Sequence, residues 1–464
     1  MQFSSGVFLL LFLPITMLLY KIGGNNREYK NLVLLIASIF FYSWGEPLFI
    51  AVVLAGVCMN YLFGIWLEKR NGNKTILVLS VIFNLGILFI FKYLTFVLGN
   101  LALFMDVKVL KIVLPIGISF YTFQIMSYIF DVYYGNVKAQ KNILHLALYI
   151  MMFPQLVAGP IVRYNTVEYE IRERIETKEM FSEGISRFIV GLSKKVMIAD
   201  YLGGIADKVF VSAECENITM VTAWIGALAF TLEIYYDFSG YSDMAIGLGK
   251  CFGFHFEENF NYPYMAKSIS EFWRRWHISL TKWFTDYVYI PLGGNRVSNK
   301  RHILNLFIVW LLTGIWHGAE WTFILWGLLY FVIQLIEKKT EFPKKLPAII
   351  GYIYTMFVVV ICWVIFKAKD MGAAVQYLGY MFNPRNTFID SVGVRYVKSA
   401  FVVCVVAYIG SFPVFPLIKE KMEEYECTRV IYACVEMVAS VVLLVFSMCV
   451  IINGSYSPFI YFNF

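Results

Sequence analysis

Long apolar runs recur along most of this chain, and they constrain its fold more than any other feature. They lie near residues 7–20, 31–44, 47–67, 76–98, 142–159, 219–236, 303–336, 346–367, 398–418 and 430–452. A bilayer core takes about 20 helical residues, and every backbone polar group within it must be satisfied inside the protein. Some runs are short and others double, so the sequence predicts about ten to twelve spanning or half-spanning helices.

Composition excludes a water-soluble globule. Hydrophobic residues make up 59% of the 464 residues and charged residues only 15%, with a mean hydropathy of +0.66. That leaves too little polar surface for a soluble chain of this size. We therefore expect an all-α, multi-pass membrane protein that forms one integral-membrane domain over residues 1–464. Its first helix should stay as an anchor, because MQFSSG lacks the positive charge of a cleavable signal and no small-residue cleavage site follows.

Other function classes lack their signatures. The net charge of +7 comes from basic residues spread over short loops such as 68–74 and 337–345, as is typical of cytoplasmic loops, so we expect no nucleic-acid partner. The eight cysteines are scattered without metal-binding spacing, so no metal site is predicted. The glycine-rich stretch 245–253 fits no phosphate-binding motif and is interpreted as a turn with a close helix contact.

The middle of the chain mixes charge with aromatic and apolar residues. Near Gly159-Pro160 an apolar helix should end and the chain should leave the membrane core, because proline cannot continue the helical ladder. Arg163 and Tyr164 then follow at the membrane interface. The arginine either anchors the chain by snorkelling or contacts an acidic ligand.

Carboxylates gather in a second segment, EIYYDFSGYSDMAIGLG (233–249). Glu233, Asp237 and Asp243 stand there beside Tyr241 in an apolar context. Carboxylates at membrane depth are costly unless they are paired or line a wet cavity, so this segment is a candidate wall of a polar site. The alternative is a turn at the Ser-Gly pair, with the aspartates capping the next helix.

The segment 271–296, EFWRRWHISLTKWFTDYVYIPLGGNR, has the pattern of an amphipathic helix at the membrane interface. One broad face carries Trp273, Trp276, His277, Leu280, Trp283, Phe284 and Tyr287, and the opposite one carries Arg275, Lys282 and Asp286. A purely interfacial helix would place a histidine with its arginines. His277 is therefore either a packing residue or part of a site.

The apolar run 303–336 is too long for one membrane span, but two spans within it would each be short. We therefore expect a hairpin or a broken helix at GIWHGAE. Non-helical backbone at membrane depth is tolerated where protein or a water-filled cavity satisfies it, so His317 should line a cavity. A neutral imidazole with an ordinary pKa near 6.5 suits a general base. Ionisable groups inside membranes are usually functional, which favours this role over a structural hydrogen bond.

Several motifs, in order, resemble the membrane-bound O-acyltransferase family. They are AGPIVRY (158–164), YYDFSGYSDMA (235–245), the segment 271–296 and LLTGIWHGAEWTFILWG (311–327). More narrowly, the chain is similar to the bacterial branch typified by the membrane subunit of alginate O-acetyltransferase. The resemblance covers nearly the whole chain and is densest from about 115 to 330.

The resemblance implies about eleven transmembrane or re-entrant helices around a central tunnel, with His317 in it as the catalytic base and His277 nearby. It implies transfer of an acyl group from a cytoplasmic thioester, acetyl-CoA or another, to a hydroxyl acceptor, with no bound cofactor. In this branch the acetyl group crosses the bacterial inner membrane to an exopolysaccharide or wall polymer. An extracytoplasmic partner acetyltransferase usually takes part.

Further residues are candidates for binding the donor or the acceptor. Basic residues near the tunnel's cytoplasmic mouth could hold the donor's phosphates, although anchoring at the interface explains them equally. The full set of binding candidates is Arg163, Asp237, Tyr241, Asp243, Arg274, Arg275, Lys282 and Arg296.

Other functions remain as alternatives. YIPLGGNR (289–296) favours the polysaccharide-acetylating branch over D-alanyl transfer to teichoic acid, which is the second enzymatic reading. A polysaccharide transporter would also place histidine and carboxylates at mid-depth. A non-catalytic scaffold would tolerate the loss of both histidines.

Overall fold

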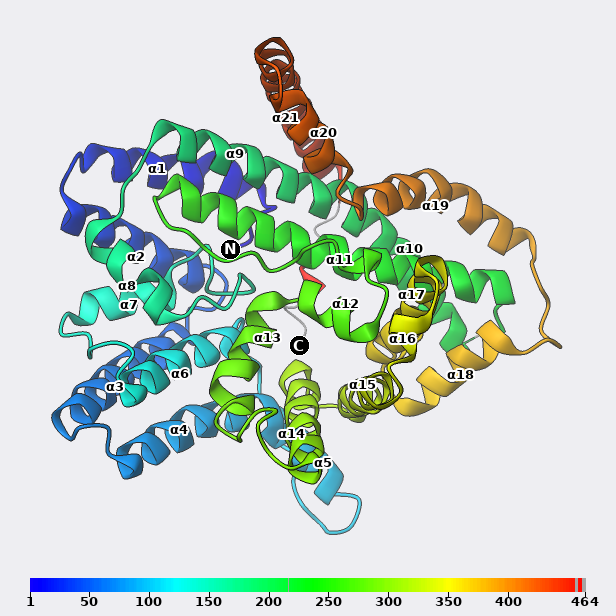
Figure 1. Cartoon of the computed structure of the whole chain (residues 1–464), viewed down its shortest axis with the longest axis horizontal. Coiled ribbons are helices and arrows are strands. Elements are labelled where there is room, and N and C mark those ends of the chain that lie inside the picture. The colour runs from blue at the N-terminus through cyan, green and yellow to red at the C-terminus, as the bar shows by residue number, and fades with distance from the viewer. Residues whose placement is uncertain (216, 455–457, 461–464) are drawn as a thin grey trace. The chain divides into compact units, whose positions relative to one another are not determined.

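The computed structural model describes residues 1–215, 217–454 and 458–460. Its secondary structure is helical throughout this part of the chain, with no strand, so the predicted all-α fold is confirmed (Figure 1). The chain forms two compact units, each described by itself. Unit 1 comprises Met1–Phe188 and Tyr241–Glu258 with the described residues after 453, and unit 2 comprises Ile189–Gly240 and Asn259–Asn453. That the whole chain is one domain stays a prediction.

Six helical stretches among the described residues are long and apolar enough to cross a membrane. They are Ile50–Lys69, Lys74–Leu101, Trp321–Thr340, Ala348–Lys367, Ser391–Gly410 and Glu426–Asn453. A shorter apolar helical stretch, Phe8–Ile22, precedes them. Together they support the expected membrane character of the chain.

Unit 1 is a set of mostly apolar helices, three of which begin after an asparagine cap. It holds η1 (Phe8–Phe12), α1 (Leu13–Ile22), α2 (Arg27–Ser43), α3 (Ile50–Lys69), α4 (Lys74–Leu88), η2 (Phe89–Tyr93), α5 (Leu94–Leu101), α6 (Ile118–Tyr134), α7 (Ile143–Met151), α8 (Tyr164–Glu173) and most of α9 (Lys178–Ser193). Asn26, Asn73 and Asn142 start α2, α4 and α7, each accepting a backbone N–H with its side chain. Such caps satisfy donors that the first helical turn leaves unpaired.

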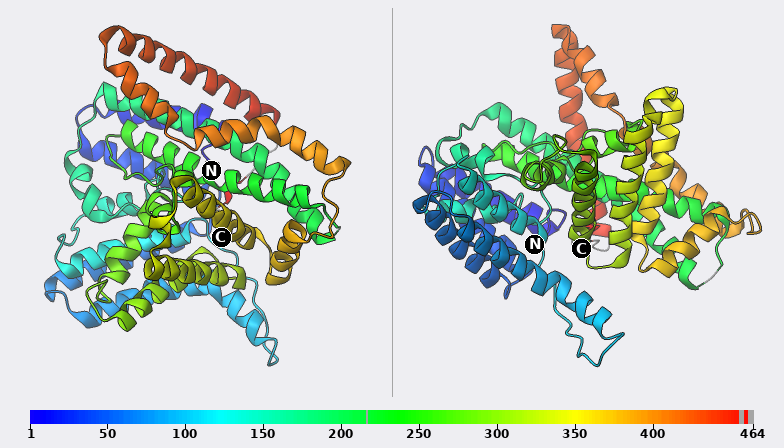
Figure 2. Two further views of the ribbon diagram at one scale, coloured as in Figure 1. Left: turned by 45° about the vertical axis from the view of Figure 1, so that its right-hand side comes forward. Right: turned by 60° about the horizontal axis from the view of Figure 1, so that its bottom comes forward.

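Unit 2 contains both predicted histidines, and Figure 2 gives two further views of the ribbon, coloured along the chain. Its elements are η3 (Lys194–Ala199), α10 (Asp200–Cys215), most of α11 (Met220–Cys251), η4 (Pro263–Met265), α12 (Ile269–Arg275), α13 (Ile278–Phe284), η5 (Thr285–Tyr289), α14 (Asn299–His317), α15 (Trp321–Thr340), α16 (Phe342–Lys345), α17 (Ala348–Lys367), α18 (Met371–Phe382), α19 (Ser391–Gly410), α20 (Val414–Glu423) and α21 (Glu426–Asn453).

The expected end of a helix at Gly159-Pro160 is wrong. Helix α7 ends at Met151, and the next residues form turns and extended backbone up to α8. The physical reason is Pro154, because the residue before a proline is pushed out of the helical region. Residues 152–162 are nevertheless buried, and Tyr164 is fully buried with its ring against Tyr128 and Tyr149.

The turn suggested at the Ser-Gly pair does not exist. Helix α11 runs unbroken from Met220 to Cys251 through Ser239 and Gly240. The glycine-rich stretch does make the close helix contact expected of it. In unit 1 a Cβ on Gly247 would lie 2.5 Å from the carbonyl oxygen of Gly184 in α9, so the backbones touch.

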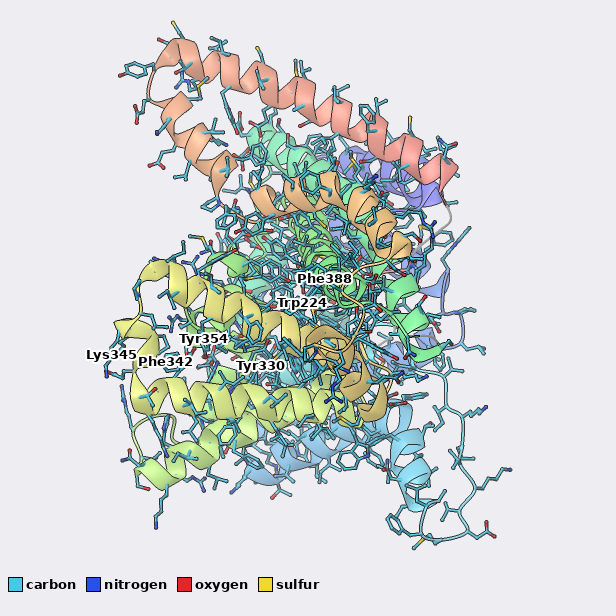
Figure 3. The ribbon with its side chains drawn as sticks, turned by 90° about the vertical axis from the view of Figure 1, so that its right-hand side faces the viewer. Trp224, Tyr330, Phe342, Lys345, Tyr354 and Phe388 are labelled. Atoms are coloured by element: carbon cyan, nitrogen blue, oxygen red, sulfur yellow. The ribbon has the colours of Figure 1, made fainter. Side chains whose placement is uncertain are left out.

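The predicted hairpin at GIWHGAE is confirmed. Helix α14 ends at His317, Gly318 is extended, and α15 begins at Trp321. The two helices approach so closely that a Cβ on Gly327 would lie 2.5 Å from the carbonyl oxygen of Trp310 and 3.1 Å from Cα of Gly314. Helix α17 packs on α15, and Figure 3 labels Tyr330 on α15 and Tyr354 on α17.

Replacing Gly327 by Ala should destabilise the protein, because the added Cβ meets backbone atoms that cannot turn aside. Overpacking of this kind costs about 1–3 kcal/mol. The matched control is Gly379→Ala in α18, where nothing lies within 4 Å of the new Cβ. We expect a lower melting temperature of the detergent-solubilised protein for Gly327→Ala and no decrease for Gly379→Ala. Equal melting temperatures would contradict the close contact between α14 and α15.

Candidate functional site

His277 lies at a break between two short helices, and the single amphipathic helix expected there is wrong. Helix α12 ends at Arg275, and α13 begins at Ile278. Between them His277 has φ 45° and ψ 53°, a left-handed conformation that is unusual for a residue with a side chain. The two predicted faces survive the break, since Trp273, Trp276, His277 and Leu280 are buried whereas Lys282 is exposed.

Both short helices receive caps from outside their own segment. The Glu337 carboxylate on α15 accepts hydrogen bonds from Ile269 N (2.7 Å), Ser270 N (2.9 Å) and Ser270 Oγ (2.8 Å) at the start of α12. Asn259 does the same for α13, because its carbonyl oxygen accepts from Ile278 N (2.9 Å) and its Oδ1 from Ser279 N (3.2 Å). Contacts between distant segments therefore fix the backbone on both sides of His277.

The His277 ring is fully buried. Its Nδ1 lies 3.1 Å from Oδ1 of Asn259. The ring meets Phe238 of α11 edge-on with 4.7 Å between centroids, and the indole of Trp316 with 5.8 Å. Helix α11, helix α14 and the loop at Asn259 thus each contribute one contact to the ring.

His317 is the last residue of α14 and is 2% exposed. Three aromatic rings lie close to its imidazole, with centroids 5.0 Å away for Trp316, 4.9 Å for Trp326 and 5.4 Å for Phe366. All three meet it edge-on. His317 therefore sits in an aromatic box made by the α14–α15 hairpin and α17.

The structure brings the two histidines to one place within unit 2. Both imidazoles contact the same indole, that of Trp316, although 40 positions separate them in the sequence. Two buried imidazoles beside one indole can hold a hydroxyl group and move its proton, because neutral imidazole both accepts and donates hydrogen bonds. This pair is the candidate site.

Asp237 is engaged in a buried ion pair. Nζ of Lys195 lies 2.7 Å from Asp237 Oδ1 and 2.6 Å from Asp200 Oδ1, and the Lys195 and Asp237 side chains are each 2% exposed. Lys195 belongs to the π-helix η3, and such wide turns occur often at functional positions. Asp237 directly precedes Phe238, which packs against His277. The ion pairs of Lys195 therefore hold the turn of α11 that contacts His277.

The predicted basic candidates differ in their surroundings. Arg274, Lys282 and Arg296 are exposed. Arg275 pairs with Glu271 at 2.9 Å and donates to the carbonyl oxygen of Asn261 at 3.1 Å. Burial alone would raise the pKa of Glu271, but hydrogen bonds from Lys267 N and from Arg275 hold that pKa below its ordinary value. Arg275 therefore has a structural role at the end of α12.

The remaining three candidates belong to unit 1, and each has interactions there. Arg163 pairs with Glu257 at 2.9 Å, and Arg187 binds Asp243 through Nε (3.0 Å) and Nη2 (2.9 Å). Tyr241 is 2% exposed and stacks on Phe3 with 4.8 Å between centroids. Local packing and ion pairs account for these residues.

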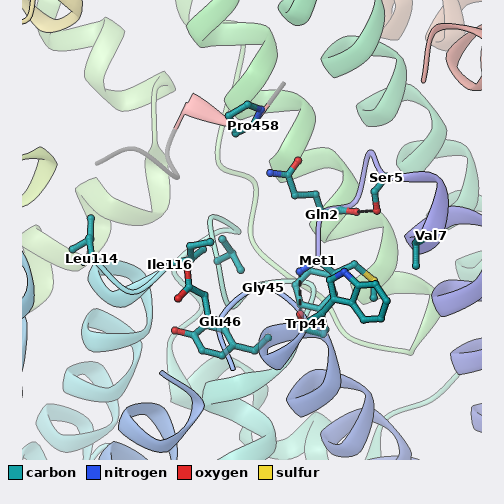
Figure 4. A pocket seen from close by; sticks show the side chains of 13 residues that line it. Met1, Gln2, Ser5, Val7, Trp44, Gly45, Glu46, Leu114, Ile116 and Pro458 are labelled. Carbon is teal, nitrogen blue, oxygen red and sulfur yellow. Dashed lines mark hydrogen bonds between the residues drawn. The ribbon is translucent and has the colours of Figure 1, made fainter. Parts of the chain in front are cut away.

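Unit 1 also contains a cavity of about 610 Å³, and none of the predicted site residues lines it (Figure 4). Its walls include Tyr42 at the end of α2, Trp44 and Glu46 directly after that helix, and Ile116 before α6. Among the described residues, no group of three or more His, Cys, Asp or Glu side chains is arranged to hold a metal ion.

Sequence reasoning missed three parts of the site. Asn259 lies in an unremarkable loop and gave no signal. Lys195 could have been noticed, because a lysine beside apolar residues in GLSKKVMIAD needs a buried partner. Phe366 belongs to the apolar run 346–367 and Phe238 to the segment 233–249, and nothing in a sequence shows which aromatic ring meets a given histidine.

A protein-family model and several known proteins match this chain. The family model described as MBOAT, membrane-bound O-acyltransferase family, matches residues 139–366, which contain both histidines. The probable alginate O-acetylase AlgI of Pseudomonas putida is 43% identical over 82% of this chain and 80% of that protein. The peptidoglycan O-acetyltransferase of Helicobacter pylori is 31% identical over 100% of the chain and 97% of that protein. The teichoic acid D-alanyltransferase of Bacillus subtilis is 28% identical over 55% and 69%.

Replacing Lys195 by Met should destabilise the protein, because it leaves the buried Asp237 carboxylate without its cation. Breaking one side of a buried pair costs about 3–5 kcal/mol. We expect a large decrease in melting temperature, partly reversed when Asp237→Asn is added, since an amide carries no charge. Lys194→Met, at the less buried neighbouring lysine, is the control and should change the melting temperature little. A Lys195→Met protein as stable as wild type would contradict the buried pair.

Proposed function

Because the chain belongs to the membrane-bound O-acyltransferase family, and within it resembles the alginate O-acetylases, we propose that this O-acyltransferase serves the O-acetylation of an exopolysaccharide or cell-wall polymer. The names of the relatives, an alginate O-acetylase and a peptidoglycan O-acetyltransferase, support acetyl as the group and a surface polymer as the final acceptor. The observation that carries the proposal is the pair of buried imidazoles on Trp316.

His317 is the general base in this proposal. Its ring nitrogen takes the proton of an acceptor hydroxyl, either of the polymer or of a serine on a partner protein, while that oxygen attacks the thioester carbonyl. A new C–O bond forms, the C–S bond breaks, and the thiolate leaving group takes the proton back from the imidazolium. His317 thus ends neutral, and the proposed reaction consumes no net proton.

Burial supports this role. His317 is 2% exposed among Trp316, Trp326 and Phe366, so little bulk water reaches the ring. Excluding water protects the thioester from hydrolysis and strengthens the hydrogen bonds to the reacting oxygen. His277, which also contacts Trp316, positions one of the reactants.

The donor in this proposal is acetyl-CoA or another cytoplasmic acyl thioester. The exposed Arg274, Lys282 and Arg296 can meet its phosphates with charge-assisted hydrogen bonds. We place the protein in the bacterial inner membrane as a multi-pass protein, with about eleven helices around a tunnel through which donor and acceptor meet. An extracytoplasmic partner acetyltransferase would pass the acetyl group on to the polymer.

D-alanyl transfer to teichoic acid is the second candidate. The relative with that name in Bacillus subtilis is 28% identical over 55% of this chain, which is both weaker and shorter than the match to the alginate O-acetylase. The same two histidines would serve it, because an ester again forms from a hydroxyl. A transporter or scaffold, in contrast, would not need His317 as a base.

His317→Ala should abolish acetylation. A general base contributes about 10²–10⁴ in rate, so the variant should match a deletion strain. The measurement is the O-acetyl content of cell-surface polysaccharide, by release with alkaline hydroxylamine, at equal membrane levels of protein. His255→Ala is the matched control, since His255 is an exposed histidine of unit 1 that pairs with Glu170, and it should keep wild-type acetylation.

Three results would count against the proposal. Wild-type acetylation with His317→Ala would remove His317 as the base. Unchanged acetylation in the deletion strain would remove polymer acetylation as the function, and D-alanyl esters would then be measured in the same strains. If polymer export fails in the deletion strain but continues in the His317→Ala strain that lacks acetylation, a transporter would be favoured.

A further inference from the structure

The side chain of Asn259, a loop residue, contacts both His277 and Ser279. It is fully buried, and its Oδ1 accepts hydrogen bonds from Ser279 N (3.2 Å) and Ser279 Oγ (2.8 Å). The same oxygen lies 3.1 Å from Nδ1 of His277. Three groups of one short stretch therefore converge on a single side-chain atom.

These contacts determine which atom of the amide faces His277. A backbone N–H can only donate, so the atom 3.2 Å from Ser279 N has to be the amide oxygen and not the nitrogen. An oxygen at 3.1 Å from Nδ1 in turn requires Nδ1 to carry the proton. A neutral His277 is then the Nδ1–H tautomer, and the lone pair of the ring lies on Nε2.

We propose that Asn259 is a positioning residue that holds His277 in the Nδ1–H tautomer, so that Nε2 of the neutral ring can accept a hydrogen bond but cannot donate one. This inference goes beyond the catalytic assignment above and rests on the proposed function only for its chemical consequence. A ring that accepts at Nε2 can hold the acceptor hydroxyl. It cannot polarise the thioester carbonyl, because that oxygen needs a donor.

The surrounding backbone keeps Asn259 in place. Asn261 N donates to the carbonyl oxygen of Arg275 (2.9 Å), and Arg275 Nη1 donates to the carbonyl oxygen of Asn261 (3.1 Å). The loop is thus tied to the end of α12 at Asn261 and to the start of α13 at Asn259. Phe238 and Trp316 flank the imidazole and limit its rotation.

The tautomer can be measured without any assay of activity. The chain has five histidines, so ¹⁵N-histidine labelling gives a spectrum simple enough to resolve in detergent-solubilised wild-type protein at pH 7.5. His277→Gln assigns the His277 signals by difference, and a melting curve checks that this variant folds. We expect a protonated Nδ1 and an unprotonated Nε2 in wild type, and loss of this fixed state in Asn259→Ala. An Nε2–H tautomer in wild type would overturn the proposal.

Kinetics distinguishes positioning from a merely structural role. With [¹⁴C]acetyl-CoA as donor in membranes, Asn259→Ala should lower kcat about 10- to 100-fold, the lower part of the range for acid–base catalysis, with KM for acetyl-CoA unchanged. Ser279→Ala is the matched control, because it removes one hydrogen bond to the same oxygen and leaves His277 Nδ1 untouched. It should keep kcat within about twofold of wild type. Equal losses in both variants would contradict positioning through Nδ1, because Ser279→Ala leaves that contact in place.

Asn259→Asp supplies a test by pH. The carboxylate keeps an acceptor next to Nδ1 but favours the imidazolium, in which Nε2 is protonated and can no longer accept. The acidic limb of the kcat profile should therefore move to higher pH than in wild type, whereas Ser279→Ala leaves the profile unchanged. An unmoved profile in Asn259→Asp would contradict the coupling. If wild-type membranes transfer no acetyl group at all, the proposed function fails, while the tautomer measurement still decides the role of Asn259.

Discussion

The hydrogen bonds that Asn259 makes to the start of α13 are the interaction on which the geometry around His277 depends. A helix of seven residues cannot hold its own first turn, because its opening N–H groups have no partner within it. Asn259 supplies those partners from 18 or more positions away, as Glu337 does for α12. The chain can therefore break between the two helices at Trp276-His277 and turn the imidazole toward Phe238 and Trp316, instead of continuing as one interfacial helix.

The position of His317 follows from a different constraint, the close approach of α14 and α15. Gly314 and Gly327 let the two backbones touch. Lipid tails are as apolar as the helices, so the hydrophobic effect does not bring helices together in a membrane, and close packing through small residues does. The hairpin turn then falls directly after His317, so the ring is held between Trp316 of its own helix and Trp326 of the next. Two constraints, external capping and glycine contact, thus place both histidines against Trp316.

The sequence predicted those structural features whose causes lie within one stretch of the chain. The apolar runs predicted an all-α membrane protein, and Gly314, Gly318 and the length of 303–336 predicted the hairpin at His317, because each signal lies within one stretch of chain. The break at His277 could not be predicted, since its cause is Asn259. For the same reason Asp237 and Asp243 attracted attention as bare carboxylates, whereas Lys195 and Arg187 already pair with them in the fold.

The proton balance of the proposed reaction explains why two imidazoles with unlike surroundings are useful. Ester formation from a thioester needs a proton removed from the hydroxyl and returned to the sulfur, so the base has to be able to release what it takes. The three aromatic rings around His317 carry no charge that would hold such a proton. His277, held through Nδ1 by a neutral amide, gains no charged partner from Asn259 either, and its Nε2 offers a fixed acceptor. An aspartate in place of Asn259 would stabilise the charged ring and hold the proton. The neutral amide, unlike a carboxylate, adds no charge that favours the imidazolium, in which Nε2 could not accept a hydrogen bond.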